Sequence, residues 1–381
     1  MDNLTREDQF SKAFSPYGNR LDTTNDPNIM DLRIKCQQTI SQYSSLDIYF
    51  DFIDNEAVNA IATKFEGSYF IGIYVGTIKV FGYLARKIAS HPKTLFDFGN
   101  PSMETNFSKV YNAIIKNANH IIEDDPPAWP ATDERQKLCI LIYQQSILNI
   151  LFHEIAHIVN GHIDYVQLLN IGYLEEVQNG KSNLSQMRSL DIQTLEIDAD
   201  GSSALRTLQE LWAIFDSDED NFKCILHDYR SLFKLWSFVR FMCWRVMENS
   251  YVGQDLLGIT HPPTAIRHDF TRIACIDLVK GRNAMLIEEY EISMALGVSA
   301  TDEAFKFLSE IDPITPPLSK QLSILQKTHG AMIFAHWDFL RNQLLEFATD
   351  YLKEPNIYND DNESFELQNA YKQLISHLKA Q

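Results

Sequence analysis

A long apolar helix with one polar stripe is the feature that most constrains this chain. Between Leu138 and Phe152 most residues are apolar, which is the pattern of a helix buried on nearly all sides. Its main polar residues recur at intervals of four and therefore share one face: Gln145, Asn149, His153 and His157. Such a stripe predicts either an internal polar site or a set of core polar groups that satisfy one another.

The last part of this stripe has the spacing of metal ligands. In His153-Glu154-Ile155-Ala156-His157, two imidazoles lie on one helical face and can bind the same metal ion. Glu154 lies about 100° around the helix from His153, close enough to polarise a water on the metal without binding the metal itself. The pattern H-E-x-x-H is typical of zinc peptidases. Gly161 predicts that the helix ends one turn after His157.

Catalytic zinc normally has three protein ligands and a water, so a third ligand is needed. The metzincin pattern would continue with a glycine and a histidine where this chain has Asn160 and Ile163, which excludes that route. His162 lies past the expected end of the helix, so we expect its ring to point away from the metal. A structural role, or support of the site from outside the ligand set, is the better interpretation for His162.

A second helical segment about 40 residues downstream offers a better ligand. In Leu195-Glu196-Ile197-Asp198-Ala199-Asp200, Glu196 and Asp200 lie four apart on one face. Glu196 could complete the zinc site, and Asp200 could accept a hydrogen bond from a ligand histidine and fix its tautomer. Small residues at 199 and 201–204 would allow close approach of this helix. The alternative is a solvated acidic face, which is common for such pairs.

With two further segments, these motifs resemble the gluzincin metallopeptidases of the HtpX and Oma type, which include soluble minigluzincins. Val58-Asn59-Ala60-Ile61-Ala62 is similar to their N-A-x-A element on an edge strand, and Thr260-His261-Pro262-Pro263-Thr264-Ala265-Ile266-Arg267 to their T-H-P-x-x-x-x-R segment. The four matches follow the family's order over roughly residues 58–267. The chain differs in lacking the family's membrane helices and in having Phe65-Glu66-Gly67 for a Pro-Gly-Gly-type turn. Its layout is also similar to the Lit type of bacterial phage-exclusion peptidase, which cleaves a translation factor.

This resemblance implies a zincin-like peptidase that binds one Zn2+ ion through His153, His157 and Glu196. Glu154 would act as the general base in hydrolysis of a protein or peptide substrate. The segment Asn59, Ala60, Ile61 and Ala62 would bind an extended substrate by strand addition, or be an ordinary sheet strand.

The last matched segment carries two candidate residues. Two prolines stiffen the backbone after His261, whose ring could donate to the developing oxyanion or simply pack at a helix start. Arg267 could pair with Asp200 or another carboxylate of the site, or lie on a solvated helix face.

The order of sequence patterns predicts an α+β fold that is predominantly helical, with a small N-terminal antiparallel or mixed sheet and a buried active-site helix. Strands are expected at 46–53, 58–63 and 68–75, with a turn at Glu66-Gly67. Helices are expected at 77–90, 104–122, 133–160, 163–176, 187–214, 222–250, 262–279 and 318–352, with a last helix after an acidic loop at 354–364. Residues 1–30 are expected to be a flexible arm, 31–300 the peptidase domain, and 301–381 a helical C-terminal region that either stands apart or belongs to the same core.

Composition limits the partners and the surroundings. A net charge of −18 argues against nucleic acid as a partner, since neutralising phosphates needs clustered Lys and Arg. The five cysteines are far apart and form no C-x-x-C pair, which predicts small core residues rather than thiolate zinc or disulfides. The N-terminus has no signal-peptide pattern, and polar residues interrupt each long apolar run, so we expect a cytoplasmic protein that does not span a membrane. The oligomeric state stays open.

Two other functions compete with the soluble zinc endopeptidase. One is a non-catalytic, metal-stabilised binding or regulatory protein that keeps the fold without the chemistry. Glu154 argues against it, because a purely structural site needs no general base. The other is a peptidase-like regulator of a DNA-bound repressor, which would favour an attached basic or helix-turn-helix segment, and no such segment is evident.

Overall fold

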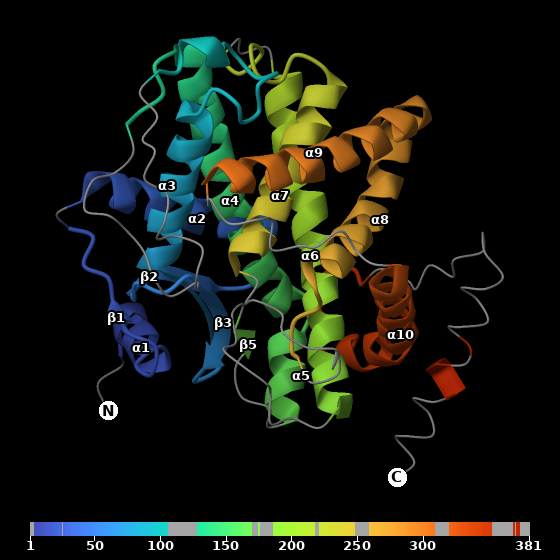
Figure 1. The fold of residues 1–381 in the computed structure, drawn as a ribbon. Coiled ribbons are helices and arrows are strands. Elements are labelled where there is room, and N and C mark those ends of the chain that lie inside the picture. Colours follow the sequence, from blue (N-terminus) through green and yellow to red (C-terminus); the bar gives the residue numbers. More distant parts are fainter. Residues whose placement is uncertain are drawn as a thin grey trace.

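The computed structural model places a small mixed sheet beside a larger body of helices (Figure 1). It describes residues 4–24, 26–105, 128–169, 174–175, 186–217, 221–247, 259–308, 320–352, 369 and 371–373. The predicted class is confirmed: the fold is α+β and mostly helical, with an N-terminal sheet and a long buried helix. The sequence-predicted helix at 104–122 falls almost wholly outside the described residues, as does most of the last one.

Within the described residues the sheet has five strands, in the order β1-β2-β4-β3-β5. The strands are β1 (Asn19–Arg20), β2 (Ile48–Asp54), β3 (Ala60–Phe65), β4 (Ser68–Tyr74) and β5 (Leu174–Glu175). The pair β2–β4 is parallel and the other three pairs are antiparallel. The predicted turn between β3 and β4 is confirmed, because Glu66 and Gly67 both have positive φ (49° and 82°), as a tight two-residue hairpin requires.

Both faces of the sheet are buried, and the strands alternate between them. Phe50 and Phe52 of β2 face the main core with the helices, whereas Ile53 faces a smaller cluster around α1 (Arg6–Ala13). Phe10 and Phe14 from the α1 region fill that second cluster. The segment predicted as a flexible arm thus contains α1, β1 and the start of α2 (Pro27–Tyr43).

The helical body is built around α4 (Asp133–Val159) and α6 (Gln186–Asp216), which pack along each other. Around them lie α3 (Val75–Ser90), α5 (His162–Leu168), α7 (Tyr229–Met247), α8 (Thr264–Arg282), α9 (Ile287–Leu308) and α10 (Lys320–Leu344). The helices predicted at 163–176 and 222–250 need correction: α5 ends at Leu168 and residues 174–175 form β5, while α7 starts only at Tyr229. Helix α9 crosses the predicted domain boundary at residue 300, and the division into domains stays a prediction.

Helix α4 is the core of the molecule. By length and composition it could cross a membrane, but 78% of its most apolar window is buried inside the protein, as in the core helix of many folded domains. At its first turn the fully buried Arg135 donates to six backbone carbonyls at the end of α3 and in the following loop. At its other end the amides of Thr349 and Asp350 donate to Val159 O. Both ends of α4 are therefore fixed.

Helix α10 is held on α6 by apolar packing and by two histidines to which sequence reasoning gave no role. His336 Nε2 lies 2.6 Å from Asp191 Oδ1, and His329 Nε2 lies 2.6 Å from Gln193 Oε1. Gln193 in turn donates to Ile259 O (2.7 Å), just before Thr260 and His261.

The cysteines follow their prediction with one exception. All five are free thiols; Cys36, Cys139, Cys243 and Cys275 are buried, whereas Cys224 is exposed.

Candidate metal centre

Helices α4 and α6 bring His153, His157 and Glu196 to one point inside the protein. The two Nε2 atoms lie 2.9 Å apart. Glu196 Oε2 is 3.2 Å from Nε2 of His153, and Oε1 is 3.5 Å from Nε2 of His157. Ligand atoms about 2.1 Å from a tetrahedral zinc ion lie roughly 3.4 Å from one another, which is close to this spacing. The residues are at most 3% exposed, so the predicted triad forms a buried candidate metal site.

Hydrogen bonding on the outer side of each imidazole determines which nitrogen faces the centre. Nδ1 of His153 lies 3.2 Å from Asp200 Oδ1, and a carboxylate only accepts, so the proton of a neutral ring is on Nδ1. Nδ1 of His157 lies 3.0 Å from Nδ1 of His162. Burial lowers the pKa of His157 well below its usual value, so this ring is neutral. Nε2 of His162 lies 3.1 Å from Asp198 Oδ2, so the lone pair of a neutral His162 is on Nδ1 and the proton of this contact is on Nδ1 of His157. Two nitrogen lone pairs and a carboxylate thus converge on one point, a set that suits a divalent cation.

Glu196 is ionised in this setting. Burial alone would raise its pKa, but His261, the neighbour that lowers it most, helps to hold the pKa well below its ordinary value. The candidate centre thus offers one negative charge and two neutral imidazoles.

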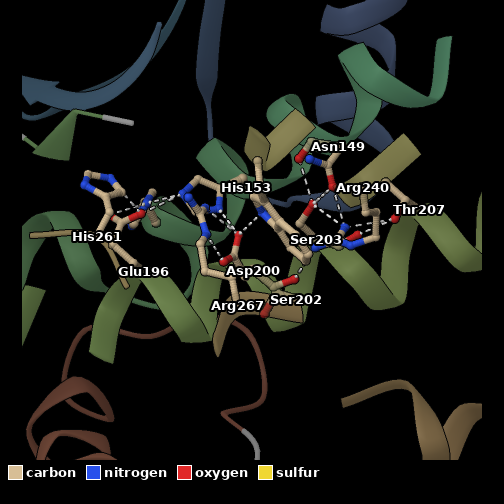
Figure 2. Close-up of polar contacts among 12 residues, drawn as sticks. Asn149, His153, Glu196, Asp200, Ser202, Ser203, Thr207, Arg240, His261 and Arg267 are labelled. Atoms are coloured by element: carbon tan, nitrogen blue, oxygen red, sulfur yellow. Dashed lines mark hydrogen bonds and ion pairs between the residues drawn. The ribbon is translucent and has the colours of Figure 1, made fainter. Parts of the chain in front are cut away.

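Asp200 has the position that sequence reasoning predicted, beside His153. Arg267 from α8 donates to both oxygens of Asp200, with Nε at 2.6 Å and Nη2 at 2.8 Å (Figure 2). Trp244 Nε1 lies 3.3 Å from Asp200 Oδ1. Burial would raise the pKa of Asp200, yet Arg267 and the hydrogen bond with His153 keep it well below its usual range. The structure therefore brings Arg267 to Asp200 rather than to a solvated helix face.

A second buried network adjoins this one, and sequence reasoning did not predict it. Arg240 from α7 is 2% exposed; its Nη2 donates to the backbone O of Asp200 (3.0 Å), and its Nη1 to Asn149 Oδ1 (Figure 2). Ser203 Oγ also donates to the backbone O of Asn149 (2.7 Å). The polar stripe of α4 therefore divides: Asn149 binds Arg240, while His153 and His157 face the metal centre. The polar stripe of α4 pointed to Asn149. No local pattern pointed to Arg240 or Trp244, because both come from α7.

His261 reaches the centre from the segment before α8. Its Nε2 lies 3.2 Å from Glu196 Oε2, its Nδ1 is 3.1 Å from Thr260 Oγ1, and its side chain is 17% exposed. A Thr260 hydroxyl that donates to Nδ1 leaves the ring proton on Nε2, the nitrogen that faces the centre. Glu154 is 1% exposed and lies between the two ligand histidines in the chain.

The segment predicted to bind substrate is more occupied than an edge strand would be. Asn59 is held at the start of α3, since its backbone N–H donates to Thr77 Oγ1 and its backbone O accepts from Tyr74 N. Ala60 pairs with β4, while Ile61 and Ala62 pair with β4 on one side and β5 on the other. The expected open edge is thus not found at residues 61–62, because β5 lies there; a substrate strand would have to displace β5 or add beyond it.

His162 lies outside the metal triad, as the interpretation of a supporting role requires. Its ring was not expected to contact a ligand, yet it packs against His157, with ring centroids 5.1 Å apart. Gly161 ends α4 as predicted, with a φ of 80°.

Arg267→Met is expected to lower the free energy of unfolding by about 3–5 kcal/mol, because it leaves the buried Asp200 carboxylate without its main counterion. Arg272→Met on the same helix is the control. Its partner is Glu291, and both side chains are about a third exposed, so its loss should cost less than about 1 kcal/mol. Urea denaturation of both variants tests this, and equal losses would contradict a special role for the Arg267–Asp200 pair.

No protein-family model, curated protein or solved structure matches this chain.

Proposed function

We propose that this protein is a zinc-dependent peptidase that hydrolyses peptide bonds of a protein substrate. The observation that carries the proposal is the convergence of His153, His157 and Glu196, with Glu154 between the two histidines on the same helix. Two imidazoles and one carboxylate are a common zinc set in hydrolases. Four segments resemble the gluzincins and follow the order found in that family, so the proposal includes membership in it. We also propose a cytoplasmic location and a role in phage defence.

The proposed chemistry divides the work among few side chains. When bound, zinc supplies Lewis acidity, lowering the pKa of water to about 7 and polarising a carbonyl. Glu154 takes the proton from the attacking water and passes it to the leaving amine, the usual role of a buried carboxylate at this position. His261, with its proton on Nε2, donates a hydrogen bond to the oxygen that becomes negatively charged.

The other residues hold this arrangement in place. Asp200 keeps the proton of His153 on Nδ1, and Arg267 keeps Asp200 ionised. The contact from Gln193 to Ile259 O fixes the backbone next to Thr260 and His261.

A second candidate function is a metal-stabilised binding protein without catalysis. It is favoured by the burial of all three ligand side chains and by β5 lying on β3, where a substrate strand would pair. Metal analysis together with a proteome-wide search for new termini separates the two functions. The peptidase makes termini that depend on Glu154, whereas the binding protein holds zinc and makes none.

His261→Phe is expected to lower kcat by about 10²- to 10³-fold, the usual cost of losing one donor to an oxyanion. Zinc content should stay at the wild-type level, because His261 lies outside the triad. The measurement is turnover on an identified substrate together with bound zinc per chain. Unchanged turnover would make His261 a packing residue, and loss of zinc would make it a ligand.

A further inference from the structure

A hydrogen-bonded chain of three residues leads away from the metal centre behind His157. Nδ1 of His157 is 3.0 Å from Nδ1 of His162, and Nε2 of His162 is 3.1 Å from Asp198 Oδ2. His162 is fully buried, and the Asp198 side chain is 13% exposed. Behind them, Asn160 Nδ2 donates to Asp198 Oδ2 (2.6 Å) and holds this carboxylate in place.

The turn at Gly161 brings His162 under His157. With a φ of 80°, Gly161 separates α4 from α5, which starts at the next residue, His162. A Cβ at Gly161 would come within 2.7 Å of Phe347 Cβ and 2.9 Å of Ala348 N, so a larger residue would shift this turn.

The proton positions along this series of hydrogen bonds follow from its last member, Asp198. Asp198 can only accept, so Nε2 of a neutral His162 carries the proton and Nδ1 of His162 has the lone pair. That lone pair requires a proton on Nδ1 of His157, and Nε2 of His157 is then unprotonated toward the metal centre. Through the ring of His162, Asp198 thus determines which nitrogen of His157 carries the proton.

The two ligand histidines are therefore fixed by two carboxylates of the same helix in different ways. Asp198 and Asp200 are two residues apart on α6, about 200° around its axis, so they cannot face the same histidine. Asp200 contacts His153 directly, at 3.2 Å. Asp198 reaches His157 only through the ring of His162.

We propose that His162, held by Asp198, is a positioning residue that fixes the tautomer and orientation of the metal ligand His157. The proposal rests on the metal centre of the proposed function but not on catalysis. Supporting groups of this kind typically contribute 10- to 100-fold to metal affinity.

Zinc affinity of three variants, measured by competition with a chelating dye, tests the proposal. His162→Phe keeps a buried ring but removes the acceptor, and should weaken zinc binding 10- to 100-fold. His162→Asn places an amide oxygen near the position of Nδ1 and should restore most of that loss. His336→Phe is the matched control, because it also removes a buried histidine bound to an aspartate of α6, at Asp191, but away from the ligands. His336→Phe should leave zinc affinity unchanged.

The tautomer of His157 can also be measured directly, without zinc. In metal-free wild type with 15N-labelled histidine, the ring nitrogens of His157 should show the tautomer protonated on Nδ1, which is the less common form of a free imidazole. His162→Phe should shift His157 toward protonation on Nε2. The proposal is overturned if wild-type His157 is protonated on Nε2, or if His162→Phe binds zinc as tightly as His336→Phe does. A protein that meets both expectations yet cleaves nothing would contradict the peptidase and leave this role of His162 intact.

Discussion

Glu154→Gln is expected to lower kcat by about 10²- to 10⁴-fold while zinc stays bound at the wild-type level. Glutamine has nearly the same shape but cannot take a proton from water, and Glu154 is not one of the three residues that converge on the metal. The assay compares the new protein termini made by wild type and by the variant, with metal content measured on the same samples.

Measuring the zinc content of Glu154→Gln separates loss of the general base from failure to fold. Glu154 is 1% exposed, so a variant that failed to fold would also lose its metal. A zinc-loaded Glu154→Gln protein with wild-type turnover would remove Glu154 as the base. A zinc-loaded wild type that makes no new termini would favour the metal-stabilised binding protein.

Glu196→Ala is expected to weaken zinc binding by on the order of 10²-fold or more. Structural zinc sites bind with apparent free energies of about 10–16 kcal/mol, or roughly 3 kcal/mol for each of four ligands. The same loss should appear as a smaller shift in the free energy of unfolding when zinc is added, because only the folded chain forms the site.

Glu210→Ala is the matched control for Glu196. Glu210 lies on the same helix and accepts a hydrogen bond from Tyr43, far from the metal triad. It should bind zinc like wild type. Full zinc occupancy and affinity in Glu196→Ala would mean that another residue is the third ligand.

Local patterns predicted the parts of this fold that depend on neighbouring residues. The hairpin at Glu66-Gly67 followed from turn residues between alternating strands, and α4 ends at Val159, close to the predicted position. The helix predicted at 163–176 was wrong at residues 174–175, because these form β5, which gains its hydrogen bonds from β3, about 110 residues earlier in the chain. Periodicity within one segment carries no information about such a partner.

The candidate site shows the same limit. His153 and His157 share a face because they are one helical turn apart, and Glu196 and Asp200 do so for the same reason. Asn149 lies on the same stripe but binds Arg240 instead of facing the metal centre. This contact could not be predicted, because Arg240 comes from α7. The contact between the rings of His162 and His157 could not be predicted either, because the direction of the chain after Gly161 depends on how α5 packs.

By itself, the sequence determined the class of fold, the helix that carries the two imidazoles, and the three side chains that meet at the candidate metal centre. These follow from helical geometry and from the burial of apolar residues, which act over a few neighbouring positions. Only the tertiary structure decided which groups hold the ligands: Asp200 with Arg267 behind His153, and His162 with Asp198 behind His157. Such hydrogen bonds join separate helices, and their geometry exists only once the helices have packed together.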